Sequence, residues 1–123
     1  MMKYVLVVDD QLSIRILLYE VLREAGYHAK CVSNGEECLK IARSFSKPSL
    51  ILLDYKMPLL NGIEVLSMLK TDSATKDIPV VMITATEDIE NEAKRKGASM
   101  VLYKPFDLNK LTELLNGTVG LQK

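Results

Sequence analysis

The sequence predicts an α/β protein in which five parallel strands form one sheet with helices on both faces. Short apolar runs alternate five times with segments whose apolar residues have helical spacing, a pattern typical of repeated right-handed strand–helix–strand crossovers. Residues 50–53 are wholly apolar and are followed by Asp54 and then Pro58. A short, fully apolar strand is typical of the buried centre of a parallel sheet. Because ligands bind outside the carboxyl ends of such strands, Asp54 marks the expected site.

Composition limits the function classes. The chain has 123 residues, which fits a single domain over residues 1–123. Sixteen basic and sixteen acidic residues cancel, which argues against nucleic-acid binding carried by bulk charge. The apolar run near the start is far too short for a signal peptide or a membrane span. With only Cys31 and Cys38 and no metal-like spacing between them, we expect a reduced cytoplasmic protein without membrane insertion.

The first strand and helix are expected before residue 26. Residues 4–8 are rich in Val and predict a buried strand, and residues 12–25 carry apolar side chains at helical spacing. Asp10 or Ser13 would cap the start of this helix. Gly26 would end it.

The middle of the chain repeats the pattern. Residues 28–32 predict a weaker strand of mixed polarity at a sheet edge, and residues 36–43 predict a short helix. After the central strand, residues 63–70 predict a helix and residues 80–84 the fourth strand. Residues 71–78 between these two elements are polar and are expected to form a loop.

The last third predicts one poorly packed helix and one amphipathic helix. Residues 87–96 are polar with few large apolar side chains, so we expect a thinly packed, mobile helix. Residues 100–103 form the fifth predicted strand. Asp107 would cap a last helix with leucines along one stripe, and residues 117–123 are expected to be a fraying tail.

Polar residues follow four of the predicted strands and should meet at one sheet edge. They are Asp9 and Asp10, Asp54, Thr84 and Lys104. Two carboxylates ~4 Å apart repel by roughly 4 kcal/mol at an effective dielectric near 20. A divalent ion would relieve this repulsion, and Mg²⁺ prefers such oxygen ligands. A metal-bound acid cluster with a lysine and a hydroxyl suits phosphoryl transfer, with Asp54 as the nucleophile.

These motifs together resemble those of a known family. Residues 7–10 (Val-Val-Asp-Asp), 52–58 (Leu-Leu-Asp-x-x-Met-Pro), 83–85 (Ile-Thr-Ala) and 104–106 (Lys-Pro-Phe) are similar to the receiver domain of bacterial two-component response regulators. The likeness covers nearly the whole chain, and residues 9–18 resemble stand-alone phosphorelay receivers of the sporulation type. It implies a flavodoxin-like, doubly wound five-stranded parallel sheet with strand order 2-1-3-4-5.

The resemblance also implies roles for the site residues. Asp54 would accept a phosphoryl group from a phosphohistidine, Thr84 would bond a phosphoryl oxygen, and Lys104 would pair with the phosphoryl group. The implied Mg²⁺ ligands are Asp9, Asp10, Asp54 and the backbone carbonyl of Lys56.

The chain departs from the family at one position near the site, and two further side chains flank the route to the acceptor. The family's switch aromatic lies three residues before the lysine, where this chain has Val101. Tyr103 has the same strand parity as Val101 and can present its ring on the same face. Lys56 and Thr86 flank the path of an attacking water, and a long lysine there would shield an acyl phosphate.

The leading interpretation is a signalling phosphoacceptor that acts through proteins, not an enzyme beyond its own phosphoryl transfer and slow dephosphorylation. Its expected partners are a sensor histidine kinase or a histidine phosphotransfer protein, and a downstream protein target, with no direct contact to nucleic acid. It would be a monomer or a weak dimer. Both relay to a second histidine protein and phosphorylation-dependent target binding fit the sequence.

Two other classes share parts of this pattern. A Mg²⁺-dependent aspartyl phosphatase would carry Asp-x-Asp after the first strand, whereas Asp9 and Asp10 are adjacent and Gln11 follows. A flavin carrier would need a phosphate-binding loop there, and the acidic pair would repel a phosphate.

Overall fold

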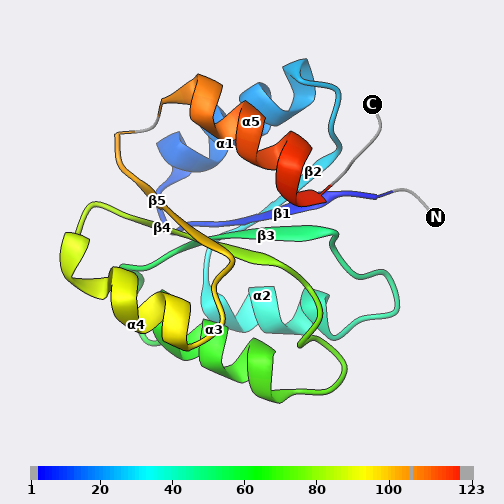
Figure 1. Cartoon of the computed structure of the whole chain (residues 1–123). Coiled ribbons are helices and arrows are strands. Elements are labelled where there is room, and N and C mark those ends of the chain that lie inside the picture. The colour runs from blue at the N-terminus through cyan, green and yellow to red at the C-terminus, as the bar shows by residue number, and fades with distance from the viewer. Residues whose placement is uncertain (1–2, 106, 120–123) are drawn as a thin grey trace.

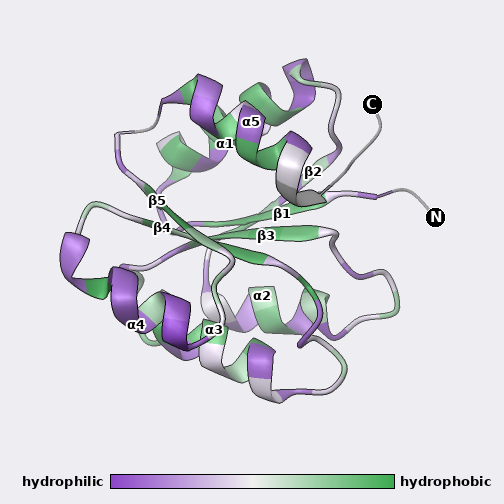
Figure 2. Cartoon of the chain, in the orientation of Figure 1, coloured by the Kyte–Doolittle hydropathy of each residue, from purple (hydrophilic) through white to green (hydrophobic). Residues whose placement is uncertain are grey.

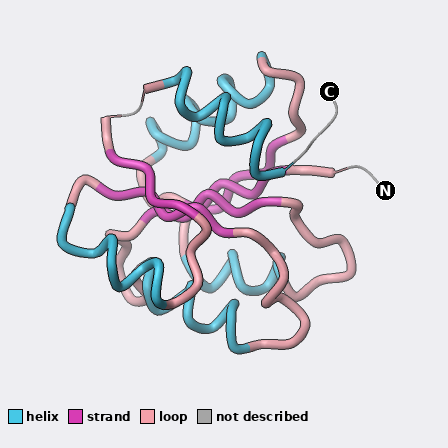
Figure 3. The backbone as a smooth tube through the Cα atoms, viewed as in Figure 1, coloured by secondary structure: helices cyan, strands magenta, loops and turns pink. Residues whose placement is uncertain are grey.

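The five strands form one parallel sheet in the order β2-β1-β3-β4-β5, as the family resemblance implies. A computed structural model describes residues 3–105 and 107–119, and side chains through residue 117. The strands are β1 (Val5–Val8), β2 (Ala29–Val32), β3 (Leu50–Asp54), β4 (Val80–Thr84) and β5 (Met100–Tyr103). Figure 3 shows the sheet between two helical layers. The weak second strand lies at an edge, as predicted.

Helices cover both faces of the sheet. They are α1 (Leu12–Glu24), α2 (Gly35–Ala42), α3 (Gly62–Thr71), α4 (Glu90–Arg95) and α5 (Leu108–Val119). Helices α1 and α5 pack on one face, and α2, α3 and α4 pack on the other (Figure 1). Among the described residues, no helix combines the length and the apolarity needed to cross a membrane.

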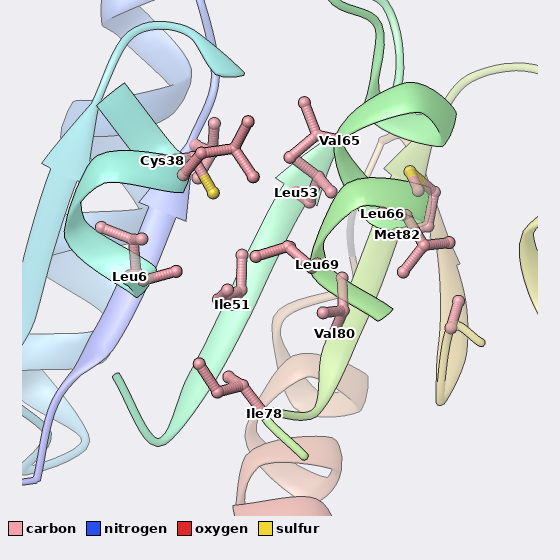
Figure 4. Close-up of a cluster of buried hydrophobic side chains, with 14 of the residues drawn as sticks. Leu6, Cys38, Ile51, Leu53, Val65, Leu66, Leu69, Ile78, Val80 and Met82 are labelled. Atoms are coloured by element: carbon pink, nitrogen blue, oxygen red, sulfur yellow. The ribbon is translucent and has the colours of Figure 1, made fainter. Parts of the chain in front are cut away.

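Strand β3 contributes to both halves of the core. Leu50 and Leu52 belong to the apolar cluster under α1 and α5. Ile51 and Leu53 belong to the cluster under α2, α3 and α4 (Figure 4). Each strand of a doubly covered sheet buries both sets of alternating side chains, which explains why residues 50–53 are all apolar. Figure 2 shows mostly apolar strands between helices that mix apolar and polar residues.

Two sequence predictions about helices were wrong. Helix α1 starts at Leu12 and has no side-chain cap from Asp10 or Ser13. The capping position is Gln11, whose amide donates to the Asp9 carboxylate. Residues 87–96 divide into a 3₁₀ turn, η1 (Glu87–Ile89), and the short helix α4. Residues 117–119 belong to α5 and residues 120–123 lie outside the described part, so the fraying tail stays a prediction.

Two other predictions of helix ends agree with the structure. Gly26 has a φ of 91°, a conformation that glycine adopts without strain, and its amide donates to the Arg23 carbonyl beyond the end of α1. The Asp107 carboxylate accepts the Asn109 amide at 2.9 Å, as expected for a capping residue of α5.

Candidate functional site

Four strand ends bring the predicted site residues together at one edge of the sheet. Asp54 and Thr84 are the last residues of β3 and β4, and Asp9 and Lys104 directly follow β1 and β5. The Lys104 Nζ lies 3.1 Å from Asp54 Oδ1 and 3.3 Å from Asp9 Oδ2. The parallel arrangement causes this convergence, because all carboxyl ends lie on the same side of the sheet.

An acidic cluster forms one side of the site. Asp9, Asp10 and Asp54 each offer a carboxylate oxygen, and these atoms lie within 4.8 Å of one another. Asp9 and Asp54 are 1% and 3% exposed, whereas Asp10 is exposed. The pKa of Asp54 is raised to about 6, chiefly because the carboxyl is buried and also because the Asp9 carboxylate lies beside it, whereas the hydrogen bond and charge of Lys104 oppose this rise. One lysine therefore does not balance the charge of this cluster.

The donor set fits Mg²⁺. Three hard carboxylate oxygens lie close together, and the exposed Asp10 leaves a side open to solvent, which suits an ion that retains bound waters. Lys56 lies two residues after Asp54 and lines the same cavity, and its backbone carbonyl is the further oxygen ligand that the family resemblance implies. These four residues could hold the ion.

The cavity over Asp54 has a volume of about 510 Å³. It is lined by Asp10, Gln11, Asp54, Lys56, Thr84, Ala85, Thr86 and Lys104. The cavity is therefore lined by two of the three clustered acids, by the lysine and the threonine of the site, and by Lys56 and Thr86, the two residues expected beside an attacking water.

Lys104 is a charged bridge between two acids. Burial by itself lowers the pKa of its ammonium, but the hydrogen bond and charge of Asp54, together with Asp9, outweigh burial and raise that pKa. The ammonium is therefore retained at neutral pH, where it can neutralise an anion bound at Asp54.

Thr84 is held by the turn that follows β4. Its hydroxyl oxygen accepts the Thr86 amide at 2.9 Å, and the side chain is 2% exposed. This bond keeps the hydroxyl at the sheet edge while leaving it on the cavity wall.

Glycine at position 62 lets α3 approach the acceptor strand. A Cβ there would lie 2.5 Å from the Asp54 carbonyl oxygen and 2.8 Å from the Tyr55 Cα. The Gly62 amide donates to the Tyr55 carbonyl at 2.7 Å. Asn61 and Glu64 form a capping box, so the start of α3 is fixed directly behind Asp54.

Tyr103 lies on the face predicted from strand parity. Val101 packs against the cluster under α2, α3 and α4, and the Tyr103 hydroxyl donates to Glu90 of α4 on that same face. Tyr103 is also the register partner of Thr84 in the neighbouring strand.

Our sequence interpretation assigned no site role to Gln11 or Arg15. Gln11 lines the cavity, and the Arg15 guanidinium donates to the Asp9 carbonyl at 2.8 Å. The position of Gln11 directly after the acidic pair is a usable signal. The reach of Arg15 depends on the angle between α1 and β1, which residue spacing does not reveal.

The fold and the site define a class of protein: a doubly wound α/β domain with a cluster of three carboxylates, a lysine and a hydroxyl at the carboxyl edge of its sheet. The family model for the response regulator receiver domain matches residues 5–116. The chain belongs to this family of signalling domains. Receiver domains generally bind Mg²⁺ at an acidic site, and they interact with histidine kinases or phosphotransfer proteins.

Similar proteins support this assignment over nearly the full chain. Sporulation initiation phosphotransferase F of Bacillus subtilis is 37% identical over 120 residues, covering 96% of this chain and 94% of the relative. Protein PilH of Pseudomonas aeruginosa is 34% identical, with 97% and 99% covered. The chemotaxis protein CheY4 of Vibrio cholerae has a solved structure with a TM-score of 0.86 and 32% identity, with 96% and 99% covered.

Other relatives are longer. The phosphate regulon transcriptional regulatory protein PhoB of Pseudomonas aeruginosa is 34% identical, and the match covers 95% of this chain but 52% of the relative. The comparisons give the aspartyl phosphatase alternative no support.

Proposed function

We propose that Asp54 accepts a phosphoryl group from a phosphohistidine of a sensor histidine kinase or a histidine phosphotransfer protein. The observation that carries this proposal is the 3.1 Å contact between the buried Asp54 carboxylate and the Lys104 ammonium, inside a cavity shared with Thr84 and Asp10. A carboxylate held beside a cation in an open cavity is suited to attack phosphorus.

In the proposed reaction one Asp54 carboxylate oxygen forms a bond to phosphorus while the phosphorus–nitrogen bond to the donor imidazole breaks. The bonding electron pair leaves with the imidazole nitrogen. Lys104 pairs with the phosphoryl oxygens, and the Thr84 hydroxyl donates to one of them. Mg²⁺ held by Asp9, Asp10, Asp54 and the Lys56 carbonyl would offset the charge on these oxygens.

The raised pKa of Asp54 affects the protonation state of the acceptor before Mg²⁺ binds. With a pKa of about 6, the carboxylate is mostly ionised at neutral pH and is a competent nucleophile. Below that pH it is protonated and its nucleophilicity falls.

The acyl phosphate would pass to a further histidine protein in a relay. Residues 9–18 resemble sporulation-type receivers, and the exposed Lys56 lies on the cavity wall, where its long side chain can shield the phosphoryl group from water. We infer that residues 1–123 act as one receiver domain, as a monomer or weak dimer. The free thiols Cys31 and Cys38 suit the reducing cytoplasm.

The test uses acetyl phosphate and Mg²⁺ as the phosphodonor system. Intact mass spectrometry should show one added phosphoryl group on the wild type and none on Asp54→Ala. Asp77→Ala, which removes an exposed acid in the α3–β4 loop, should be labelled like the wild type. An adduct of equal yield on Asp54→Ala would refute the assignment.

The lifetime of the adduct tests the shielding role proposed for Lys56. Lys56→Ala should lose phosphate faster than the wild type, because the shielding stem is removed. Equal rates would remove Lys56 from the proposal without affecting Asp54.

A further inference from the structure

Arg15 connects the second turn of α1 to the main chain of the acidic loop. Its Nη1 donates to the Asp9 carbonyl oxygen at 2.8 Å. This carbonyl lies between two elements. Strand β1 ends at Val8, and the first backbone hydrogen bond of α1 runs from the Arg15 amide to the Gln11 carbonyl. The guanidinium therefore supplies a partner that neither the sheet nor the helix provides.

Other contacts of Asp9 fix its remaining polar groups. Its amide donates to the Val32 carbonyl at 3.2 Å. Its Oδ1 accepts the Gln11 amide at 2.9 Å, and its Oδ2 pairs with Lys104 at 3.3 Å. Arg15 adds the restraint on the peptide that leads away from Asp9.

That peptide joins Asp9 to Asp10. The Asp9 carbonyl and the Asp10 amide lie in one rigid plane, so fixing the carbonyl also fixes the direction in which the chain enters Asp10. Asp10 is the exposed member of the acidic cluster, and its side chain has more freedom than the buried Asp9.

We propose that Arg15 is a positioning residue that holds the Asp9–Asp10 peptide so that the Asp10 carboxylate is oriented for Mg²⁺. This inference rests on the proposed function, because it concerns the metal site of that reaction. Outer partners that orient metal ligands typically alter metal affinity by about 10–100-fold when removed.

The effect acts through geometry and not through charge at the cluster. The Arg15 charge acts on the Cys31 thiol of β2, where it opposes the burial that raises the pKa of that thiol. The charged groups that act on Asp54 are Asp9, Lys104 and Asp10. If Arg15 acted as a competing cation, its removal would strengthen Mg²⁺ binding, whereas loss of positioning weakens it.

The first measurement is Mg²⁺ affinity by isothermal titration calorimetry with magnesium chloride on the unphosphorylated chain. Arg15→Met keeps much of the side-chain length but removes every donor, and it should weaken binding about tenfold. Arg15→Lys restores one donor and should recover part of the affinity. Arg23→Met is the matched control on the same helix, because Arg23 is exposed and pairs with Glu20, and its affinity should equal that of the wild type.

A second readout needs no metal. Without Mg²⁺, hydrogen exchange of the peptide covering residues 8–12 should be faster in Arg15→Met than in Arg23→Met. If Arg15→Met does not fold, Arg15→Lys and Arg15→Gln carry the same comparison. Unchanged or tighter Mg²⁺ binding in the folded Arg15 variants would overturn the inference.

The two proposals fail differently. If the wild type neither binds Mg²⁺ nor gains a phosphoryl group from acetyl phosphate, the proposed function fails. If the wild type does both and the Arg15 variants match it, only the positioning role fails.

Discussion

The Tyr103 hydroxyl at the end of β5 donates a hydrogen bond to the Glu90 carboxylate at the start of α4. The bond to Glu90 raises the pKa of Tyr103 to about 12. Glu90 also pairs with Lys94 one turn later, at 3.0 Å. Tyr103 therefore links β5, the strand that pairs with the end of β4 at Thr84, to α4, the helix that follows β4 along the chain.

Removing this bond should loosen α4. Few apolar side chains pack η1 and α4 against the core, and the buried ones are Ile89 and Ala93. The Tyr103–Glu90 hydrogen bond should therefore contribute much of the stability of this segment. Tyr103→Phe should increase hydrogen exchange over residues 87–96. Tyr19→Phe alters an exposed tyrosine on α1, across the sheet, and should leave that exchange unchanged. Equal exchange in the two variants would show that the bond does not restrain α4.

Neutralising Asp54 should stabilise the metal-free fold at neutral pH. Its folded-state pKa of about 6 lies above the ordinary value of 3.8, so the folded state binds a proton more tightly than the unfolded state. Stability from this group is therefore highest at low pH and falls as the pH rises from about 4 to about 6. Asp54→Asn should raise the free energy of unfolding at pH 7 by roughly 1–2 kcal/mol, and the gain should shrink toward pH 4.

Thermal and urea unfolding between pH 4 and pH 7.5 in a chelator would measure this. Asp77→Asn, an exposed acid, is the control for a general loss of negative charge. A loss of stability in Asp54→Asn at pH 7 would mean that its pair with Lys104 outweighs the burial of the carboxylate.

Leu59 has a backbone conformation that leucine disfavours. Its φ is 69°, and its side chain is 98% exposed, so it has little packing to offset a cost of about 1–2 kcal/mol. Leu59→Gly should relieve this strain, but glycine also increases the conformational entropy of the unfolded chain and so offsets part of the gain. The net stabilisation should reach up to about 1 kcal/mol. Leu59→Ala keeps the strain and should change stability by less than about 0.5 kcal/mol.

Urea denaturation of both variants tests the prediction. Equal effects of alanine and glycine would mean that the backbone at Leu59 is not strained.

The strand ends of the site could be predicted from the sequence because each is a local event. An apolar run followed by Asp54, Thr84 or Lys104 fixes where the strand stops, and parallel pairing brings the ends together. The hydrogen bonds from Arg15 to the Asp9 carbonyl and from Tyr103 to Glu90 were not predicted. Whether a long side chain reaches another element depends on the orientation of a helix, which residue spacing does not reveal. The same cause explains the start of α1, where the choice of Asp9 over Asp10 or Ser13 depends on how the loop turns.

Gly62 should be the least replaceable glycine near the site. A Cβ at this position would meet the Asp54 carbonyl at 2.5 Å, the Met82 Sδ at 2.8 Å and the Tyr55 Cα at 2.8 Å. Two of these atoms are backbone and cannot move aside without shifting β3 or α3. Gly62→Ala should therefore lower the free energy of unfolding by about 1–3 kcal/mol, and it should slow phosphorylation of Asp54 by acetyl phosphate because the acceptor strand end is displaced.

Gly117 has the free space that Gly62 lacks, so the same replacement by alanine should have the opposite effect on stability. It lies in α5, and a Cβ there meets nothing within 4 Å. Gly117→Ala should stabilise the protein by up to about 1 kcal/mol, because alanine favours helix more than glycine does, and it should leave Asp54 labelling unchanged. Urea unfolding together with the labelling rate separates the two substitutions, since the crowding argument predicts opposite signs of stability change for the same chemical replacement. If Gly62→Ala proved as stable as the wild type, α3 would have room to withdraw from β3, and the close approach behind Asp54 would not be a requirement of the fold.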